Sequence, residues 1–132
     1  MNALGHTAAA LVIKKRWPEV PILPLVISTQ IVELFWVAFN LLDIEKTRID
    51  DPATFIGSVH LYHMPWSHSI LSGLVFASIA WLVCAKGLNR PGWGIALALG
   101  VISHTVLDVA THVPDMPIMI VPISGNKIAS AM

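Results

Sequence analysis

"WGIALALGVISHTVLDVATH", residues Trp93–His112, decides how this chain folds, because it is long and apolar and yet carries ionisable groups. A helix needs roughly 20 predominantly apolar residues to cross the hydrocarbon core of a bilayer, and this stretch has that length. Within it, His104, Asp108 and His112 follow one another at intervals of four residues. Side chains at this spacing lie along one stripe of an α-helix, so the stretch predicts a membrane-spanning helix with one ionisable face.

The composition of the whole chain also indicates a membrane location. Apolar residues make up 55% of the 132 residues and charged residues 12%, and the formal net charge is zero. A soluble domain of this size would need more polar residues to cover its surface. The balanced charge also argues against nucleic acid as a partner. The partner that the composition predicts is the lipid bilayer.

Two further stretches, Ile22–Leu42 and Trp66–Ala85, are long and apolar enough to span a bilayer. Residues Met1–Ile13 are apolar but too few to cross, so we expect a short N-terminal helix that enters the bundle. Residues 113–132 contain three prolines, which forbid a regular transmembrane helix there. We therefore predict an all-α membrane helical bundle with three transmembrane helices, a short N-terminal helix and a proline-rich C-terminal segment. Residues 1–132 form one membrane-embedded domain, and the abrupt end leaves a C-terminally incomplete chain as an open alternative.

The distribution of lysine and arginine predicts how the bundle is oriented. One face of the membrane receives Lys14, Lys15, Arg16, Lys86 and Arg90, and the other receives Lys46 and Arg48. Short loops rich in Lys and Arg stay in the cytoplasm, so the first face is expected to be cytoplasmic. The long polar segment over residues 43–65 then faces the periplasm or the exterior.

On this topology the ionisable side chains gather at one level. All six histidines fall in the outer half of the protein, where Asp108 also lies, and Glu33 lies midway along the first span. A charged group at bilayer depth normally faces the bundle interior or a wet cavity. Imidazole and carboxylate together are typical ligands of zinc and similar divalent ions, so we expect a metal site there. A protonated Glu33 that only bonds a neighbouring helix is the structural alternative.

These residues resemble a family, the predicted inner-membrane metal-dependent hydrolases of bacteria. That family has an N-terminal Gly-His, a carboxylate motif, an "H-R-x-x-T-H-S" box and a "G-x-x-S-H-x-x-x-D-x-x-T" box. This chain has Gly5–His6, "HMPWSHS" at residues 63–69 and "GVISHTVLDVAT" at residues 100–111. The resemblance implies a multi-pass protein of the cell inner membrane, and the orientation predicted above puts its site toward the periplasmic side. It also implies a metal-site set made of His6, Glu33, His63, His68, His104 and Asp108.

The chain departs from the family pattern in its carboxylate motif and in its histidine box. Glu33 stands where "L-P-D-x-D" has its first aspartate, and Phe35 stands where it has the second. Met64 replaces the arginine after His63, and Ser67 replaces the threonine before His68. The lost carboxylate and the lost arginine put hydrolytic activity, and above all a two-metal site, in question.

Three functions follow from these observations. The leading hypothesis is a metal-dependent hydrolase of an ester or phosphodiester, in which zinc or a similar divalent ion activates water and Glu33 or Asp108 is the general base. The alternative is a non-catalytic membrane subunit of a larger complex, with a membrane-protein partner and a structural or relic metal site. A minor alternative is haem binding, with His68 and His104 as axial ligands.

Overall fold

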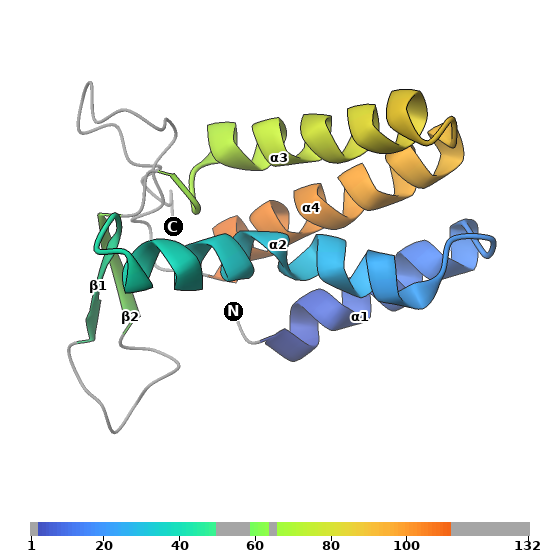
Figure 1. The fold of residues 1–132 in the computed structure, drawn as a ribbon. Coiled ribbons are helices and arrows are strands. Elements are labelled where there is room, and N and C mark those ends of the chain that lie inside the picture. The colour runs from blue at the N-terminus through green and yellow to red at the C-terminus, as the bar shows by residue number, and fades with distance from the viewer. Residues whose placement is uncertain (1–2, 50–58, 64–65, 112–132) are drawn as a thin grey trace.

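The computed structural model describes residues 3–49, 59–63 and 66–111, which form a helical bundle with a small antiparallel sheet at one end (Figure 1). Along the chain the elements are α1 (Ala3–Arg16), α2 (Ile22–Leu41), β1 (Lys46–Ile49), β2 (Val59–His63), α3 (Ile70–Leu82) and α4 (Pro91–Thr111). A π-helical turn, Val83–Gly87, continues α3. The predicted all-α bundle is confirmed, including the short N-terminal helix.

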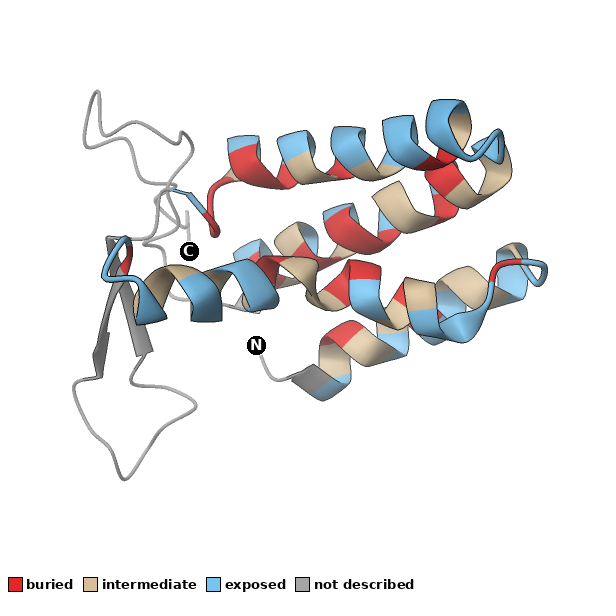
Figure 2. Cartoon of the chain, in the orientation of Figure 1, coloured by how far each residue is buried: buried red, intermediate tan, exposed pale blue. Residues whose placement is uncertain are grey.

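Three helices within the described residues are long and apolar enough to cross a membrane: Ile22–Leu41, Ile70–Gly87 and Pro91–Ala110. Their outward faces expose large apolar side chains, among them Leu23, Leu34, Leu74, Ile79, Ile95 and Val106. Figure 2 shows this exposure along the outer faces of α2 and α3, with buried residues turned toward the neighbouring helices. Water would not favour such a surface, whereas lipid does. The chain is a multi-pass membrane protein.

The second span begins later than the sequence predicts, at Ile70 and not at Trp66. Ser69 is the N-cap of α3, where its hydroxyl accepts a hydrogen bond from the Ser72 backbone N–H at 3.1 Å. The Ser72 hydroxyl in turn accepts one from the Ser69 N–H at 3.0 Å. Because this reciprocal box satisfies two helix-end donors, it starts the helix at Ile70 and leaves residues 66–69 outside it.

Helix α4 lies at the centre of the bundle, where it packs against α1, α2 and α3. Its contacts are close because small residues face each other. A Cβ atom on Gly100 would lie 2.1 Å from the Ser28 hydroxyl oxygen, and one on Gly73 would lie 2.4 Å from Thr105 Oγ1. Small residues at such crossings let helix backbones approach closely in a membrane, where no hydrophobic force drives helices together. This closeness brings the polar side chains of α4 within reach of the other helices.

One end of the bundle, here called the basic end, holds the connections from α1 to α2 and from α3 to α4 (Figure 1). Two arginines there lie over tryptophan rings, with Arg16 5.4 Å from the Trp17 centroid and Arg90 4.6 Å from the Trp93 centroid. Tryptophan and arginine are typical of the interface between membrane and water. The basic end therefore marks one membrane surface.

The opposite end holds the sheet, which the sequence did not predict. The sequence predicts a polar loop over residues 43–65, whereas β1 and β2 pair in antiparallel fashion within it. Lys46 lies opposite His63, and Ile49 lies opposite Val59. The proline-rich C-terminal segment and His112 lie outside the described residues.

Candidate metal centre

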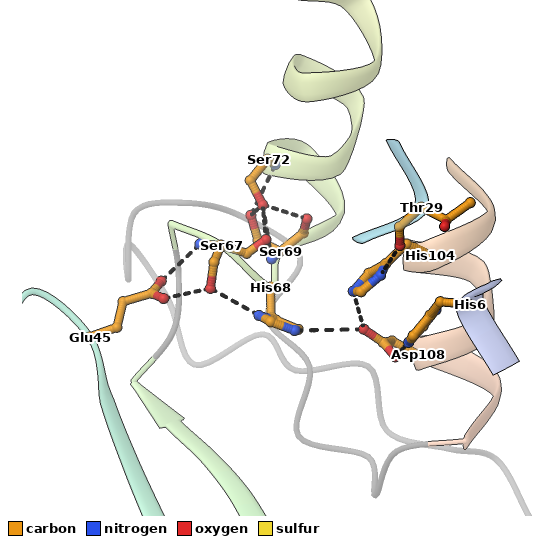
Figure 3. Close-up of polar contacts among 9 residues, drawn as sticks. All are labelled: His6, Thr29, Glu45, Ser67, His68, Ser69, Ser72, His104 and Asp108. Carbon is orange, nitrogen blue, oxygen red and sulfur yellow. Dashed lines mark hydrogen bonds and ion pairs between the residues drawn. The ribbon is translucent and has the colours of Figure 1, made fainter. Parts of the chain in front are cut away.

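The carboxylate of Asp108 lies at the centre of a cluster of imidazoles (Figure 3). His104 Nε2 is 3.0 Å from Asp108 Oδ2, and His68 Nε2 is 3.7 Å from the same oxygen. His6 Nε2 is 3.3 Å from the other oxygen, Oδ1. His6, His104 and Asp108 are each 0% exposed, so the carboxylate is completely shielded from solvent.

Three separate parts of the chain bring these side chains together. His6 lies in the first turns of α1, His68 lies just before α3, and His104 and Asp108 lie one turn apart in α4. All of them belong to the half of the bundle away from the basic end, because α1 starts there and α4 ends there (Figure 1). The predicted stripe of α4 thus faces the bundle interior and meets residues from α1 and from the segment before α3.

His104 is held by a backbone group of α2. Its Nδ1 lies 2.8 Å from the carbonyl oxygen of Thr29. A carbonyl can only accept, so His104 donates its Nδ1–H to Thr29, and this bond turns Nε2 toward Asp108. A ligating histidine is usually oriented in this way, by a hydrogen bond from the ring nitrogen that does not bind the metal.

His6 is buried against His104 without the hydrogen bonds that a buried imidazole normally has. The two rings stack with centroids 3.9 Å apart and planes inclined by 17°. Neither ring nitrogen of His6 forms a hydrogen bond within the described part of the chain, and the same holds for His104 Nε2. Each Nε2 atom instead faces an oxygen of Asp108 as an ion pair, at 3.3 Å for His6 and 3.0 Å for His104. A metal ion bound by the three residues would take up the same Nε2 atoms.

Glu33 reaches the cluster from the middle of α2. Two groups of three residues have ligand atoms within 4.8 Å of one another, namely His6 with His104 and Asp108, and Glu33 with His68 and His104. Glu33 is half-buried, whereas every member of the first group is fully buried. The cluster therefore has a closed side at Asp108 and a more open side at Glu33.

This set of donors fits a divalent metal ion of the zinc type. Imidazole nitrogen and carboxylate oxygen are its usual ligands, and the separations above require only small movements to close around one ion. Haem does not fit. Axial ligation would need an open gap for the porphyrin between His68 and His104, and the carboxylate of Asp108 lies beside both Nε2 atoms.

The structure brings together five of the six predicted site residues: His6, Glu33, His68, His104 and Asp108. The sixth, His63, is the last residue of β2, and its side chain lies outside the described part of the chain. Phe35, which stands where the resembled motif has its second aspartate, stacks on Phe76 of α3 with centroids 4.7 Å apart. Its side chain therefore has a packing role.

Sequence reasoning missed two side chains and one backbone group that support the cluster. Glu45 and Ser67 are both 1% exposed and form a chain of hydrogen bonds to His68 (Figure 3). The Thr29 carbonyl holds His104. The position of Ser67, directly before His68, was the one available signal, whereas Glu45 stood in a polar segment with several other acidic residues.

Comparisons with protein-family models, with curated proteins and with solved structures find no match to this chain. The resemblance to the inner-membrane hydrolases therefore remains an expectation from the motifs.

Proposed function

We propose that this protein binds a divalent metal ion, zinc or a similar one, and uses it to hydrolyse an ester or phosphodiester bond. One observation carries the proposal. The Nε2 atoms of His6 and His104 converge on the Asp108 carboxylate at 3.3 and 3.0 Å, in a fully buried site inside a membrane bundle. A buried carboxylate is costly at this depth unless it is compensated, and a cation bound by all three residues compensates it.

The residues take different roles in this proposal. His6, His104 and Asp108 hold the ion, and His68 adds a further nitrogen beside Asp108. The ion would supply Lewis acidity and would make a water molecule nucleophilic near neutral pH. Because Asp108 is enclosed by imidazoles, the half-buried Glu33 is the carboxylate left to accept a proton from that water at its Oε atoms.

The substrate class follows from the place of the cluster. The cluster lies away from the basic end, and the positive-inside rule assigns the basic end to the cytoplasm. We therefore place the site toward the periplasmic side of the cell inner membrane. An ester or phosphodiester of a lipid or envelope component would meet the protein there, which agrees with what the family resemblance implies.

Complete burial of His6, His104 and Asp108 favours a second candidate function. Structural metal sites are closed by protein ligands, whereas catalytic sites keep one position open. A non-catalytic membrane subunit could keep such a closed site as a clamp between α1 and α4. This candidate predicts bound metal without hydrolysis, and a membrane-protein partner that copurifies.

The first test is the metal content of the full chain, purified in detergent and measured by elemental analysis. We expect about one equivalent of zinc or a similar ion, as in a mononuclear site, and its loss in His104→Ala and in Asp108→Asn. Gln30→Ala is the matched control, because Gln30 is a half-buried polar residue of α2 that bonds Thr7. It should keep the metal. Helical wild-type protein that retains no metal after incubation with zinc would overturn the proposal.

The second test separates the two candidates. Metal-loaded protein is assayed with p-nitrophenyl esters and with bis-p-nitrophenyl phosphate. Hydrolysis that stops with a chelator, returns with zinc and is lost in Asp108→Asn supports the hydrolase. A full equivalent of metal with no hydrolysis, together with a fixed copurifying partner, supports the structural subunit.

A further inference from the structure

Glu45 lies just after α2, in a turn that carries its side chain back into the bundle. Asp43 has a left-handed backbone with φ of 58°, and the Ile44 N–H donates to the Phe39 carbonyl at 2.9 Å. A left-handed residue and a hydrogen bond of this kind commonly end a helix and reverse the chain. Glu45 follows directly and is 1% exposed. The turn at the end of α2 thus places the carboxylate of Glu45 inside the bundle, although Glu45 is not one of the proposed metal ligands.

Both oxygens of the Glu45 carboxylate accept hydrogen bonds from the segment that leads into α3. The backbone N–H groups of Trp66 and Ser67 each donate to Oε1 at 2.8 Å. The Ser67 hydroxyl donates to Oε2. A buried carboxylate requires such donors, and these bonds are strengthened by its charge. The hydroxyl proton of Ser67 is therefore directed at Glu45.

The direction in which the Ser67 hydroxyl proton points determines the tautomer of His68. Ser67 Oγ lies 2.9 Å from His68 Nδ1. A hydroxyl has a single proton, and a carboxylate can only accept. Since the Ser67 proton goes to Glu45, its oxygen accepts the proton of His68 Nδ1. In a neutral imidazole the lone pair then lies on Nε2, the atom 3.7 Å from Asp108 Oδ2 (Figure 3).

We propose that Glu45 and Ser67 form a positioning pair, which holds His68 as its Nδ1–H tautomer and presents the Nε2 lone pair to the metal site. His104 is held in the same tautomer by the Thr29 carbonyl. Partners of this kind fix both the tautomer and the ring orientation of ligating histidines. The part that concerns the metal rests on the proposed function, whereas the tautomer is a property of the metal-free chain.

Starting α3 does not require the Ser67 hydroxyl. Ser69 and Ser72 form the cap of that helix by themselves. Ser69→Ala is therefore a matched control, because it removes a buried hydroxyl two residues from Ser67 and leaves the bonds from Glu45 to His68 in place. Ser67→Thr is the conservative rescue, because it keeps the hydroxyl.

We expect the substitution Glu45→Gln to switch His68 to the other tautomer. Oε1 must continue to accept two backbone N–H groups, so the amide NH2 takes the place of Oε2 and donates to Ser67 Oγ. The Ser67 proton then turns to His68 Nδ1, which becomes the acceptor. The imidazole proton moves to Nε2, where it blocks the atom that would bind the metal.

The tautomer is measured by two-bond ¹⁵N–¹H correlation spectra of the metal-free full chain, with labelled imidazoles, in micelles at about pH 8.5, where an ordinary imidazole is neutral. His68→Gln identifies the His68 signals. We expect Nδ1–H in the wild type, in Ser67→Thr and in Ser69→Ala, Nε2–H in Glu45→Gln, and a mixture in Ser67→Ala. An Nε2–H signal in the wild type, or an unchanged tautomer in Glu45→Gln, would overturn the proposal.

Zinc affinity, measured in competition with a chromogenic chelator, is the second readout. We expect Glu45→Gln and Ser67→Ala to bind zinc about 10- to 100-fold more weakly, and Ser67→Thr and Ser69→Ala to bind as the wild type does. If the wild type binds no zinc but the tautomers follow the expected pattern, the proposed function fails and the positioning pair stands. If zinc binds equally well to Glu45→Gln, the pair positions no ligand.

Discussion

Asp108 and Glu33 are both acidic residues within spans, yet their surroundings differ. Asp108 is fully buried with an imidazole nitrogen within 3.3 Å of each carboxylate oxygen. Glu33 is half-buried and approaches His68 and His104 with ligand atoms within 4.8 Å. Paired groups in unlike surroundings commonly divide the work of catalysis. On the proposed function Asp108 binds the ion and Glu33 moves the proton.

This division predicts that two isosteric changes have different effects. Glu33→Gln should keep its zinc and lower kcat by about 10²- to 10⁴-fold, which is the usual contribution of a general base. Asp108→Asn should lose the zinc itself. Elemental analysis and ester hydrolysis of the same samples give both quantities. If Glu33→Gln loses zinc to the same degree as Asp108→Asn, Glu33 is a ligand and the base lies elsewhere.

At the residue scale, the sequence predicts the site residues that belong to a motif or follow one another at a helical spacing. The interval of four between His104 and Asp108 places them on one face of α4, and the polar groups of a span must turn inward. Glu45 has no such signal, because its role depends on a turn after α2 that meets the segment before α3. The Thr29 carbonyl cannot be predicted at all, since every residue has one.

At the scale of the helices, the crossing of α2 and α4 sets the geometry of the site. Gly100 lies one turn before His104 and faces Ser28, the neighbour of Thr29. The Ser28 hydroxyl is tied to the Leu25 carbonyl at 2.8 Å, so it cannot rotate away without losing that bond. The distance between these two backbones therefore controls the hydrogen bond that orients His104.

Gly100→Ala should consequently weaken both the bundle and the site. The added methyl would lie 3.1 Å from Ser28 Cβ and closer still to its hydroxyl, so α2 and α4 must separate. We expect a loss of about 1–3 kcal/mol in the free energy of unfolding, as for other overpacked cores, and weaker zinc binding. Gly87→Ala is the control, because nothing lies within 4 Å of its added Cβ. Equal unfolding midpoints and equal zinc affinities of the two variants in detergent would contradict this account.

Helices were easier to predict than strands, for a physical reason. A span must satisfy its backbone hydrogen bonds within its own sequence, so length and apolar composition reveal it. The pairing of β1 with β2 joins segments separated by nine residues that form no tight turn signal, and strand pairing depends on such distant contacts. The start of α3 was predicted too early because the apolar run includes Trp66, whereas Ser69 and Ser72 fix the helix start.

At the scale of the whole molecule, the two ends of the bundle have opposite character. Basic side chains and arginine–tryptophan contacts mark one end, and the histidine cluster lies toward the other. The protein therefore has a polarity along the membrane normal. From this polarity the positive-inside rule predicts an orientation with the basic end in the cytoplasm, as the proposed function requires.

Cysteine labelling tests that orientation. In a Cys84→Ala background, Lys15→Cys places a thiol at the basic end and Asp43→Cys places one at the opposite end, and both positions are exposed. We expect a membrane-impermeant maleimide to label Asp43→Cys in intact spheroplasts and to label Lys15→Cys only after permeabilisation. The reverse pattern would place the cluster on the cytoplasmic side.

Two residues of the cluster lie near opposite ends of the described chain, His6 near the start of α1 and Asp108 near the end of α4. During synthesis the imidazole of His6 leaves the ribosome about a hundred residues before its carboxylate partner. Helix α4, the last helix of the described residues, must therefore enter the bilayer beside α1, which was synthesised earlier, and in the correct orientation. On the proposed function, a chain with one helix inverted or missing cannot load its ion. Bound metal per molecule would then report the fraction of chains that have completed membrane insertion, independently of any catalytic assay.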